Sequence, residues 1–181
     1  MNRDSMTIKE LIEIISSDLY RYESKVNFKC FLRYLFFTPG FKYSYRMRIY
    51  RFISDKRYLN ILKSLMKLSL KRLTYKYGIQ IPMETNIGEG LLITHFGGIF
   101  INPESKIGKN FTICQDVTIG INKGGVPTIG DNVYVAAGAK VIGDINVGNN
   151  SIIGVNSVVT KNVPDNAVVA GNPMRILYYK I

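Results

Sequence analysis

One side chain in this sequence is suited to proton transfer near neutral pH, and it is the single histidine, His95. An imidazole titrates near neutrality, so it can take the proton of a hydroxyl group as the oxygen attacks. Gly97 and Gly98 follow closely and leave room for a ligand. Any site that needs two histidines from one subunit is excluded. Cys30 and Cys114 lie in different segments without the spacing of a disulfide or a metal site, so we expect no metal.

A six-residue repeat of aliphatic side chains runs through the segment that holds His95. Its members are Ile81, Ile87, Ile93, Ile99, Ile107, Ile113, Ile119, Ile129, Val135, Val141, Val147, Ile153 and Val159. A period of six fits neither a helix nor a single strand, and it predicts a parallel β-helix with an aliphatic residue pointing inward at every corner. Three such hexapeptides form one coil, and coils stack about 4.8 Å apart.

The repeat is interrupted twice. Ile107 follows Ile99 by eight residues instead of six, and we place the resulting bulge at Asn102–Pro103. Ile129 follows Ile119 by ten residues, which predicts a short protruding loop over 122–125. Extra residues in a solenoid point outward, and such loops often belong to the binding face.

The stacking of coils predicts which distant residues are neighbours. His95 lies two residues after Ile93, and the equivalent positions in the next coils are Gln115, Ala137 and Val155. We expect these four residues to form one column along the solenoid. Gln115 could also be an ordinary solvent-facing residue, and the case for Ala137 and Val155 depends on the stacking alone.

The first 78 residues have helical periodicity. Thr7 followed by Glu10 is a capping-box pattern, and apolar residues recur after it at helical spacing. We predict further helices over 28–37, 43–54 and 59–76, with Pro39–Gly40 as a break after the first of these. We therefore divide the chain into a basic helical region (1–78), a β-helix (79–170) and a C-terminal tail (171–181).

The net charge of +11 belongs to the helical region alone. Residues 1–78 hold 17 Lys and Arg against 6 Asp and Glu, and the remaining residues hold 7 of each. This asymmetry indicates an anionic surface or partner. One interpretation is a packing element with a solvated charged face, and the other is a peripheral contact with an anionic membrane. Residues proposed to face the lipid are Arg46, Arg48, Arg51, Lys63, Lys67 and Lys71.

No segment is long and apolar enough to cross a membrane, and the first residues lack the apolar core of a signal peptide. We expect a cytoplasmic protein, at the inner membrane face if the lipid contact exists. No nucleic-acid motif is present, so we expect no nucleic-acid partner.

Residues 79–175 resemble the left-handed β-helix hexapeptide acyltransferases. The stretch from Ile87 to Ile99 is similar to the serine acetyltransferase branch, as are 114–120, 158–164 and 170–175. The resemblance implies an all-β left-handed parallel β-helix with an α-helical N-terminal region, and a homotrimer that binds acetyl-CoA in grooves between subunits.

Site residues follow from the same resemblance. His95 matches the catalytic base, and Gln115, Ala137 and Val155 would line the CoA groove. Thr160 and Lys161 match a Thr-Lys pair that contacts CoA near its phosphates, and Arg175 matches a later basic contact. Cys114 fits a packed thiol better than a nucleophile.

The chain departs from this branch at several site positions, and the branch's Arg that holds the serine carboxylate is also absent. Serine acetyltransferases carry a second His beside the proline that matches Pro127, where this chain has Val126. Their Asp before the catalytic His is Thr94 here, and the Asp that orients that His aligns with Gln80. Asp116 and Glu104 are the two acidic candidates to replace it, and the alternative is that each is simply solvated.

We therefore expect an acetyl-CoA-dependent O-acetyltransferase that acts on a hydroxyl of a surface-polysaccharide sugar or its lipid-linked precursor. The short helical region resembles that of serine-acetyltransferase-like enzymes of such pathways. The alternatives are a serine O-acetyltransferase of cysteine biosynthesis and a non-catalytic trimeric scaffold.

Overall fold

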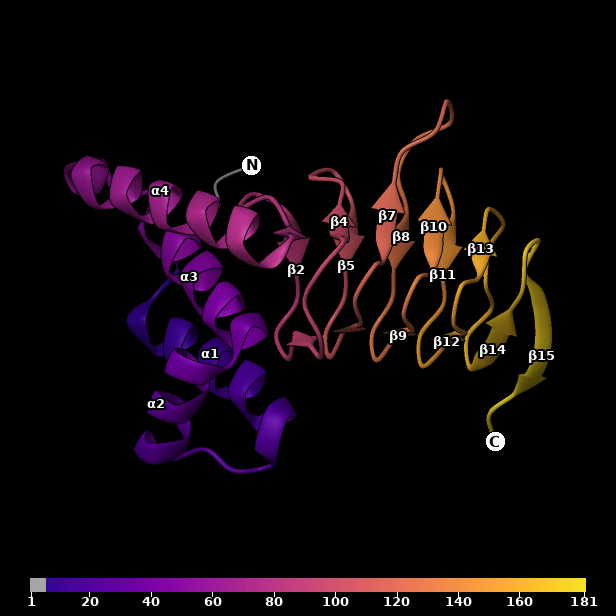
Figure 1. Cartoon of the computed structure of the whole chain (residues 1–181), viewed down its shortest axis with the longest axis horizontal. Coiled ribbons are helices and arrows are strands. Elements are labelled where there is room, and N and C mark those ends of the chain that lie inside the picture. The colour runs from indigo at the N-terminus through magenta and orange to yellow at the C-terminus, as the bar shows by residue number, and fades with distance from the viewer. Residues whose placement is uncertain (1–5) are drawn as a thin grey trace.

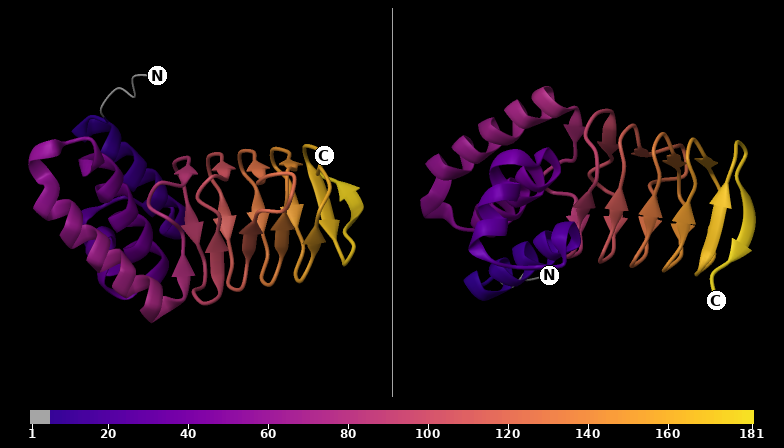
Figure 2. Two further views of the ribbon diagram at one scale, coloured as in Figure 1. Left: turned by 90° about the horizontal axis from the view of Figure 1, so that it is seen from above. Right: turned by 60° about the horizontal axis from the view of Figure 1, so that its bottom comes forward.

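The computed structural model describes residues 6–181 and consists of a helical region followed by a tapering solenoid (Figure 1). The helices are α1 (Ile8–Glu23), α2 (Phe28–Phe37), α3 (Pro39–Ser54) and α4 (Asn60–Tyr77), with a 3₁₀ turn over Arg57–Leu59. They gather at one end of the solenoid and leave its sides uncovered (Figure 2). Among the described residues, no helix is long and apolar enough to cross a membrane.

Local sequence signals explain the helix ends. The predicted capping box is confirmed, because Glu10 donates its N–H to the Thr7 hydroxyl and Thr7 donates its N–H to the Glu10 carboxylate. The second predicted helix is confirmed as α2. Pro39 does more than end that helix, since it occupies the first turn of α3, where a missing N–H costs nothing. Gly78 ends α4 with a φ of 61°, a left-handed conformation that favours glycine.

The solenoid contains fifteen short strands in chain order. They are β1 (Ile79–Gln80), β2 (Asn86–Ile87), β3 (Leu92–Ile93), β4 (Ile99–Ile101), β5 (Lys106–Ile107), β6 (Thr112–Ile113), β7 (Thr118–Gly120), β8 (Thr128–Ile129), β9 (Tyr134–Val135), β10 (Lys140–Ile142), β11 (Asn146–Val147), β12 (Ile152–Ile153), β13 (Val158–Val159), β14 (Ala167–Ala170) and β15 (Arg175–Tyr179).

Every third strand pairs in parallel, which gives the three flat faces of a β-helix. The faces are β1-β4-β7-β10-β13, β2-β5-β8-β11 and β3-β6-β9-β12-β14, with β15 antiparallel at the end of the last. The predicted aliphatic corner residues are all buried and form one continuous core along the axis. The predicted tail thus contains a strand that extends the last face.

Three rows of turns run along the edges between the faces. We call the row after β3, β6, β9 and β12 the histidine edge, because its first turn holds His95. The row after β4, β7, β10 and β13 is the loop edge, since the predicted loop protrudes there: Asn122 and Gly125 exchange both backbone hydrogen bonds. The third row, after β2, β5, β8 and β11, is the asparagine edge, because its turns hold Asn110, Asn132 and Asn150.

One predicted interruption lies elsewhere. In the β4–β7 register Ile101 is the partner of Ile119, so Ile101 rather than Ile99 is the corner residue six positions before Ile107. The bulge predicted at Asn102–Pro103 is therefore wrong. The two extra residues lie between Ile93 and Ile101, in the turn that carries His95.

The asparagine edge is held by a ladder of side chains. Asn110, Asn132, Asn150 and Asn166 all have φ between 54° and 59° and occupy the same place in successive coils. Each of the first three donates its side-chain amide N–H to the side-chain oxygen of the next, at 2.9, 3.0 and 3.1 Å. Asn tolerates a left-handed φ better than most residues. The same turn conformation therefore recurs with Asn in each coil, and it brings the Asn side chains together in the ladder.

The helical region closes the open end of the β-helix. The first coil has no preceding coil, so its outward backbone groups need other partners. Arg48 of α3 donates to the carbonyls of Ile87 and Gly88, and Leu91 donates its N–H to Asp18 of α1 at 2.8 Å. Arg48 and Asp18 also form a buried ion pair at 3.0 Å.

Two tyrosines of the helical region also supply hydrogen-bond partners to backbone groups of the first coil. Tyr43 donates its hydroxyl to the Ile81 carbonyl at 2.8 Å and accepts the N–H of Ile81, and Tyr22 does the same for Ile93. Gly40 lies against this strand so closely that an added Cβ would meet the Ile93 carbonyl. The helices are therefore a cap on the solenoid, which favours the packing interpretation. It also corrects the lipid-facing set, since Arg48 is buried.

Candidate active site

His95 stands on a protrusion of two residues. The turn begins normally, with Thr94 donating its N–H to Ile113 at 3.1 Å, and it closes with Asp116 donating its N–H to Gly97 at 2.7 Å. In later coils, the residues that make the opening and closing hydrogen bonds of the turn are adjacent in the sequence. Here two residues, His95 and Phe96, stand between them, so these two are the inserted pair. Both are exposed, and Gly97 beside them faces open space.

The His95 side chain has no hydrogen bond or ion pair to any residue within 6–181. Asp116, one of the two candidates to orient it, instead pairs with Lys140 at 3.2 Å. Glu104, the other, lies at the loop edge, one face away. The orientation of the imidazole within one chain therefore depends on the backbone of the turn.

The groove residues stack along the histidine edge. Gly138 donates its N–H to Gln115 at 3.1 Å and Asn156 donates its N–H to Ala137 at 2.9 Å, so Gln115, Ala137 and Val155 occupy equivalent positions. One coil before Gln115, the equivalent position is occupied by Gly97, because two residues are inserted ahead of it in that turn. The expected column is thus corrected at one member: His95 protrudes beside the column.

Features of this column suit a long ligand with amide and apolar parts. The side-chain oxygen of Gln115 is buried and has no hydrogen-bond partner among the described residues. Val155 is 62% exposed, so it offers an apolar surface on this edge. Arg175 pairs with Ala170 in the β14–β15 register and lies exposed at the far end of the same edge.

Thr160 and Lys161 lie elsewhere on the chain. They follow β13 at the loop edge, and Thr160 helps to line a cavity of about 460 Å³ together with Asn122, Lys123, Gly124 and Asp144. Within one chain the predicted CoA residues therefore divide into two sets, Gln115 to Arg175 on the histidine edge and Thr160 with Lys161 on the loop edge.

Cys114 is a packed thiol. Its sulfur accepts a hydrogen bond from the Thr94 hydroxyl at 3.3 Å. It also forms a hydrogen bond of 3.2 Å with the Tyr134 hydroxyl, in which either group can donate. That hydrogen bond, together with partial burial, raises the pKa of Tyr134. Among the described residues, no group of three His, Cys, Asp or Glu side chains could hold a metal ion.

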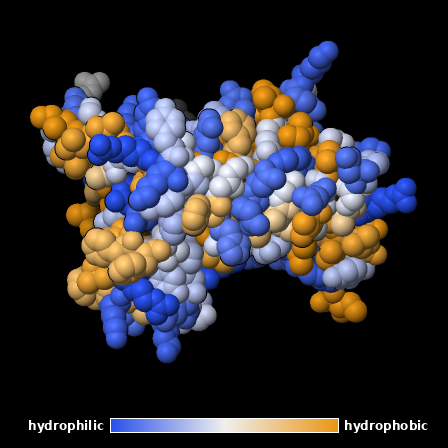
Figure 3. Space-filling view, in the orientation of Figure 1, coloured by the Kyte–Doolittle hydropathy of each residue, from blue (hydrophilic) through white to orange (hydrophobic). Residues whose placement is uncertain are grey.

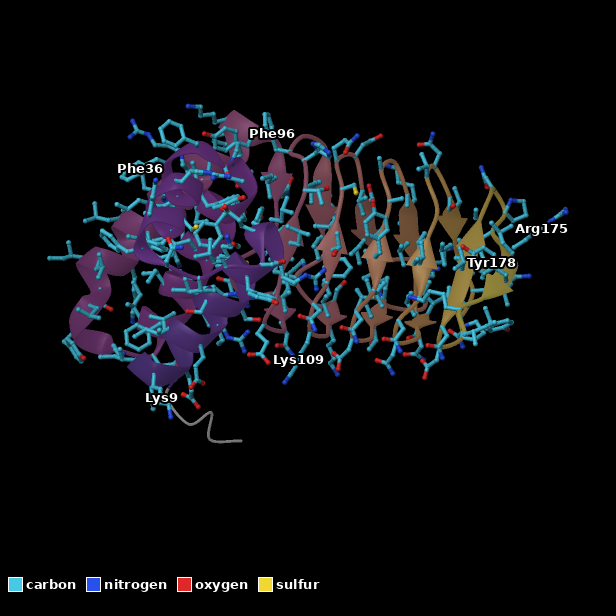
Figure 4. All side chains as sticks on the ribbon, turned by 90° about the horizontal axis from the view of Figure 1, so that it is seen from below. Lys9, Phe36, Phe96, Lys109, Arg175 and Tyr178 are labelled. Carbon is cyan, nitrogen blue, oxygen red and sulfur yellow. The ribbon has the colours of Figure 1, made fainter. Side chains whose placement is uncertain are left out.

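Two aromatic residues beside the site are absent from the predicted set. The rings of Phe96 and Tyr77 meet in a T-shaped contact with centroids 5.4 Å apart. Figure 4 shows Phe96 at the junction of helices and solenoid. The signal available in the sequence was an aromatic residue directly after the single histidine. Its partner could not be inferred, because it lies on the helix before the solenoid.

The chain is similar to curated serine acetyltransferases over part of its length. The protein from Staphylococcus aureus (strain Mu50 / ATCC 700699) is 45% identical over 104 residues, 55% of this chain and 49% of the relative. The protein from Synechococcus elongatus is 36% identical over 151 residues, 81% of this chain and 60% of the relative. The chain thus spans about half of the length of the curated relatives it matches. No protein-family profile matches it.

Solved structures extend the similarity to nearly the whole chain. Serine acetyltransferase from Brucella abortus strain S19 superposes with a TM-score of 0.80 at 26% identity, over 96% of this chain and 71% of that chain. A serine acetyltransferase in complex with CoA gives 0.77 at 28% identity, over 94% and 71%. The predicted fold class is confirmed: the chain is a left-handed parallel β-helix with an α-helical N-terminal region. These similarities support a hexapeptide acyltransferase.

Proposed function

We propose that this chain is an acetyl-CoA-dependent O-acetyltransferase. The observation that carries the proposal is the histidine edge: an exposed His95 beside open space, continued by Gln115, Ala137 and Val155 to Arg175. A structure with the same fold binds CoA. His95 accepts the proton of the acceptor hydroxyl while its oxygen attacks the thioester carbonyl. The C–S bond then breaks, and the proton passes to the departing CoA thiolate.

The residues present fit CoA. Gln115 offers a buried acceptor atom to an amide N–H of the pantetheine arm, and the exposed Val155 offers an apolar surface to its methylene groups. Arg175 provides positive charge for phosphates at the far end of this edge. Lys161 and Thr160 face another edge, so they reach the same CoA only if a neighbouring subunit supplies them. A homotrimer with sites between subunits meets this requirement.

Serine is the first candidate acceptor. The relatives and the superposed structures bear the name serine acetyltransferase, which fits this acceptor better than the sugar predicted from the sequence. Serine would enter as a zwitterion, and its ammonium and carboxylate require charged partners. In this chain Thr94 and Val126 stand where the resemblance leads us to expect an acid and a histidine, so other residues would have to supply those charges.

A sugar hydroxyl is the second candidate, on the evidence of one residue. Phe96 is 52% exposed directly beside His95. Its outer surface can stack against the apolar face of a sugar ring, a contact for which a free amino acid has no counterpart. Gly97 leaves the space in which such a ring would lie.

The deciding experiment measures CoA thiol release from acetyl-CoA with serine and with a panel of sugars and nucleotide sugars. Turnover with serine at sub-millimolar concentration supports the first acceptor, and turnover with a sugar supports the second. If a sugar is the acceptor, Phe96→Ala should raise its KM, whereas Phe96→Tyr, which keeps the ring, should not. Binding of CoA without turnover for any acceptor would favour the non-catalytic trimeric scaffold.

A peripheral contact with an anionic membrane remains a proposal for the helical region. The helix α4 contains five basic residues and no acidic one, and its outer surface exposes Ile61, Leu65, Leu68 and Tyr75. Apolar residues alternate with hydrophilic ones over the helical end in Figure 3. Basic and apolar side chains on one exposed helix suit an anionic lipid surface. Such a contact would place a cytoplasmic enzyme at the inner membrane face, next to a lipid-linked glycan.

A further inference from the structure

We infer that the C-terminal end of α4 is a brace for the His95 turn, and that Tyr77 is a positioning residue for the base. The inference rests on the proposed acetyl transfer, because it assigns the position of His95 a kinetic role. The structure supports it through three contacts of Tyr77 and the C-cap residue Gly78. They are a ring contact with Phe96, a hydrogen bond from Ile99 at the start of β4, and the close approach of Gly78 to Gly97 and Gly98.

The ring contact is the T-shaped pair of Tyr77 and Phe96. Phe96 is one of the two inserted residues, and its ring is the only side chain of the pair with a partner among the described residues. Tyr77 is half-buried against the solenoid core, so it is a fixed surface. Holding the Phe96 ring therefore restricts the backbone of the adjacent His95.

The other two contacts hold the base of the turn. Ile99 donates its N–H to the Gly78 carbonyl at 3.0 Å. A Cβ added to Gly78 would come within 3.1 Å of the Gly98 nitrogen and 3.2 Å of the Gly97 Cα. The backbone that leaves α4 thus lies directly on the two glycines that follow His95 and Phe96.

Without this brace the protrusion would have little to fix it. His95 itself has no partner within residues 6–181, and Gly97 and Gly98, with φ of 105° and 66°, add backbone freedom. A displacement of about 1 Å in a catalytic group can cost about 100-fold in rate. The helical cap therefore positions the base as well as closing the solenoid.

The test replaces Tyr77, which is not among the residues proposed to bind acetyl-CoA or the acceptor, and leaves His95 and Phe96 in place. Tyr77→Ala should lower kcat by about 10-fold to 100-fold, with the calorimetric affinity for acetyl-CoA unchanged. Tyr77→Phe keeps the ring and should retain activity. Tyr75→Ala is the matched control, because Tyr75 lies in the same last turn of α4, is 76% exposed and does not contact the turn.

A double-mutant cycle separates positioning from a general structural role. In a His95→Ala background, Tyr77→Ala should cause no further loss of rate, since the group it positions is gone. An additive loss in the double variant would overturn the inference. So would near-normal kcat in Tyr77→Ala.

A second readout does not depend on turnover. Since the chain has a single histidine, protein labelled with ¹³C-histidine gives one imidazole Cε1–H signal. Loss of the Tyr77 ring current alone would move one sharp signal, whereas release of the turn should broaden it or add a second. A single sharp signal in Tyr77→Ala would refute the brace. If no acceptor supports turnover, the proposed function fails, and this measurement still decides the inference.

Discussion

Replacing Arg48 by methionine tests the closure of the solenoid most directly. Arg48 and Asp18 are 3% and 1% exposed, and their ion pair is 3.0 Å long. Methionine fills a similar volume but leaves the Asp18 carboxylate buried without its counter-ion. Removing one partner of a buried pair costs about 3–5 kcal/mol. The carbonyls of Ile87 and Gly88 also lose their donor, so we expect a loss of about 4 kcal/mol or more.

Urea unfolding at fixed protein concentration measures this loss. With a slope of about 2 kcal/mol/M, a loss of about 4 kcal/mol lowers the midpoint by about 2 M. Arg46→Met is the control: Arg46 is half-buried and bonds to the Ser69 hydroxyl and the Lys42 carbonyl, so its loss should cost about 1 kcal/mol. Adding Asp18→Leu to Arg48→Met should restore part of the stability, because the unpaired charge is removed.

The reasoning would be refuted by a loss below about 1 kcal/mol in Arg48→Met, comparable to the control. Such a result would mean that the pair is solvated and that the helices do not seal the first coil. An Asp18→Leu/Arg48→Met variant no more stable than Arg48→Met would contradict the electrostatic part of the argument. In that case the lost backbone contacts alone would explain the effect.

Three further predictions concern the site and the helical surface. His95→Ala should lower acetyl transfer by about 10²-fold to 10⁴-fold without loss of helical or strand content by circular dichroism, and near-normal turnover would remove His95 from the mechanism. Lys161→Ala should raise the KM for acetyl-CoA at little cost in kcat, and unchanged affinity by calorimetry would make it a surface residue. Replacing Lys63, Lys67 and Lys71 together by Gln should weaken co-sedimentation with anionic vesicles by about 100-fold, whereas the same change at Lys106, Lys123 and Lys180 should not. Equal recovery from neutral and anionic vesicles would leave the charge a packing or solubility feature.

The repeat was sufficient to predict the β-helix because each buried corner needs an aliphatic side chain at a fixed interval. It could not locate the first insertion. Ile99 and Ile101 are both aliphatic and both buried, so either could be the corner residue until its pairing with Ile119 is known. The loop over 122–125 was predictable, because Asn122, Lys123 and two glycines separate Ile119 from Ile129 with no second aliphatic residue at a competing corner position.

Contacts between distant segments could not be predicted from the sequence. Arg48 looks like any other basic residue of the helical region, and nothing local marks Asp18, thirty positions earlier, as its partner. The same limit applies to Tyr77 and Phe96, which belong to regions with different periodicities. The site residues predicted along one edge depended on counting coils, and the count was wrong only where the insertion fell.

The ladder of asparagines reflects a constant spacing between coils, and this spacing fixes distances along the solenoid axis. Each coil adds the same rise along the axis, so the axial separation between two groups on one edge is set by the number of coils between them. From the β3 coil that precedes His95 to the β14 coil that pairs with Arg175 there are four steps, or about 19 Å, and Figure 4 shows Phe96 and Arg175 far apart along the long axis. Residues 130–147 make up one complete coil, between the corner residues Ile129 and Val147. Insertion or deletion of such a unit would change the length of ligand that spans the edge in increments of about 5 Å while leaving each turn intact. If this edge binds acetyl-CoA as proposed, the number of coils sets the length of acyl carrier that it accommodates, separately from the chemistry proposed for His95.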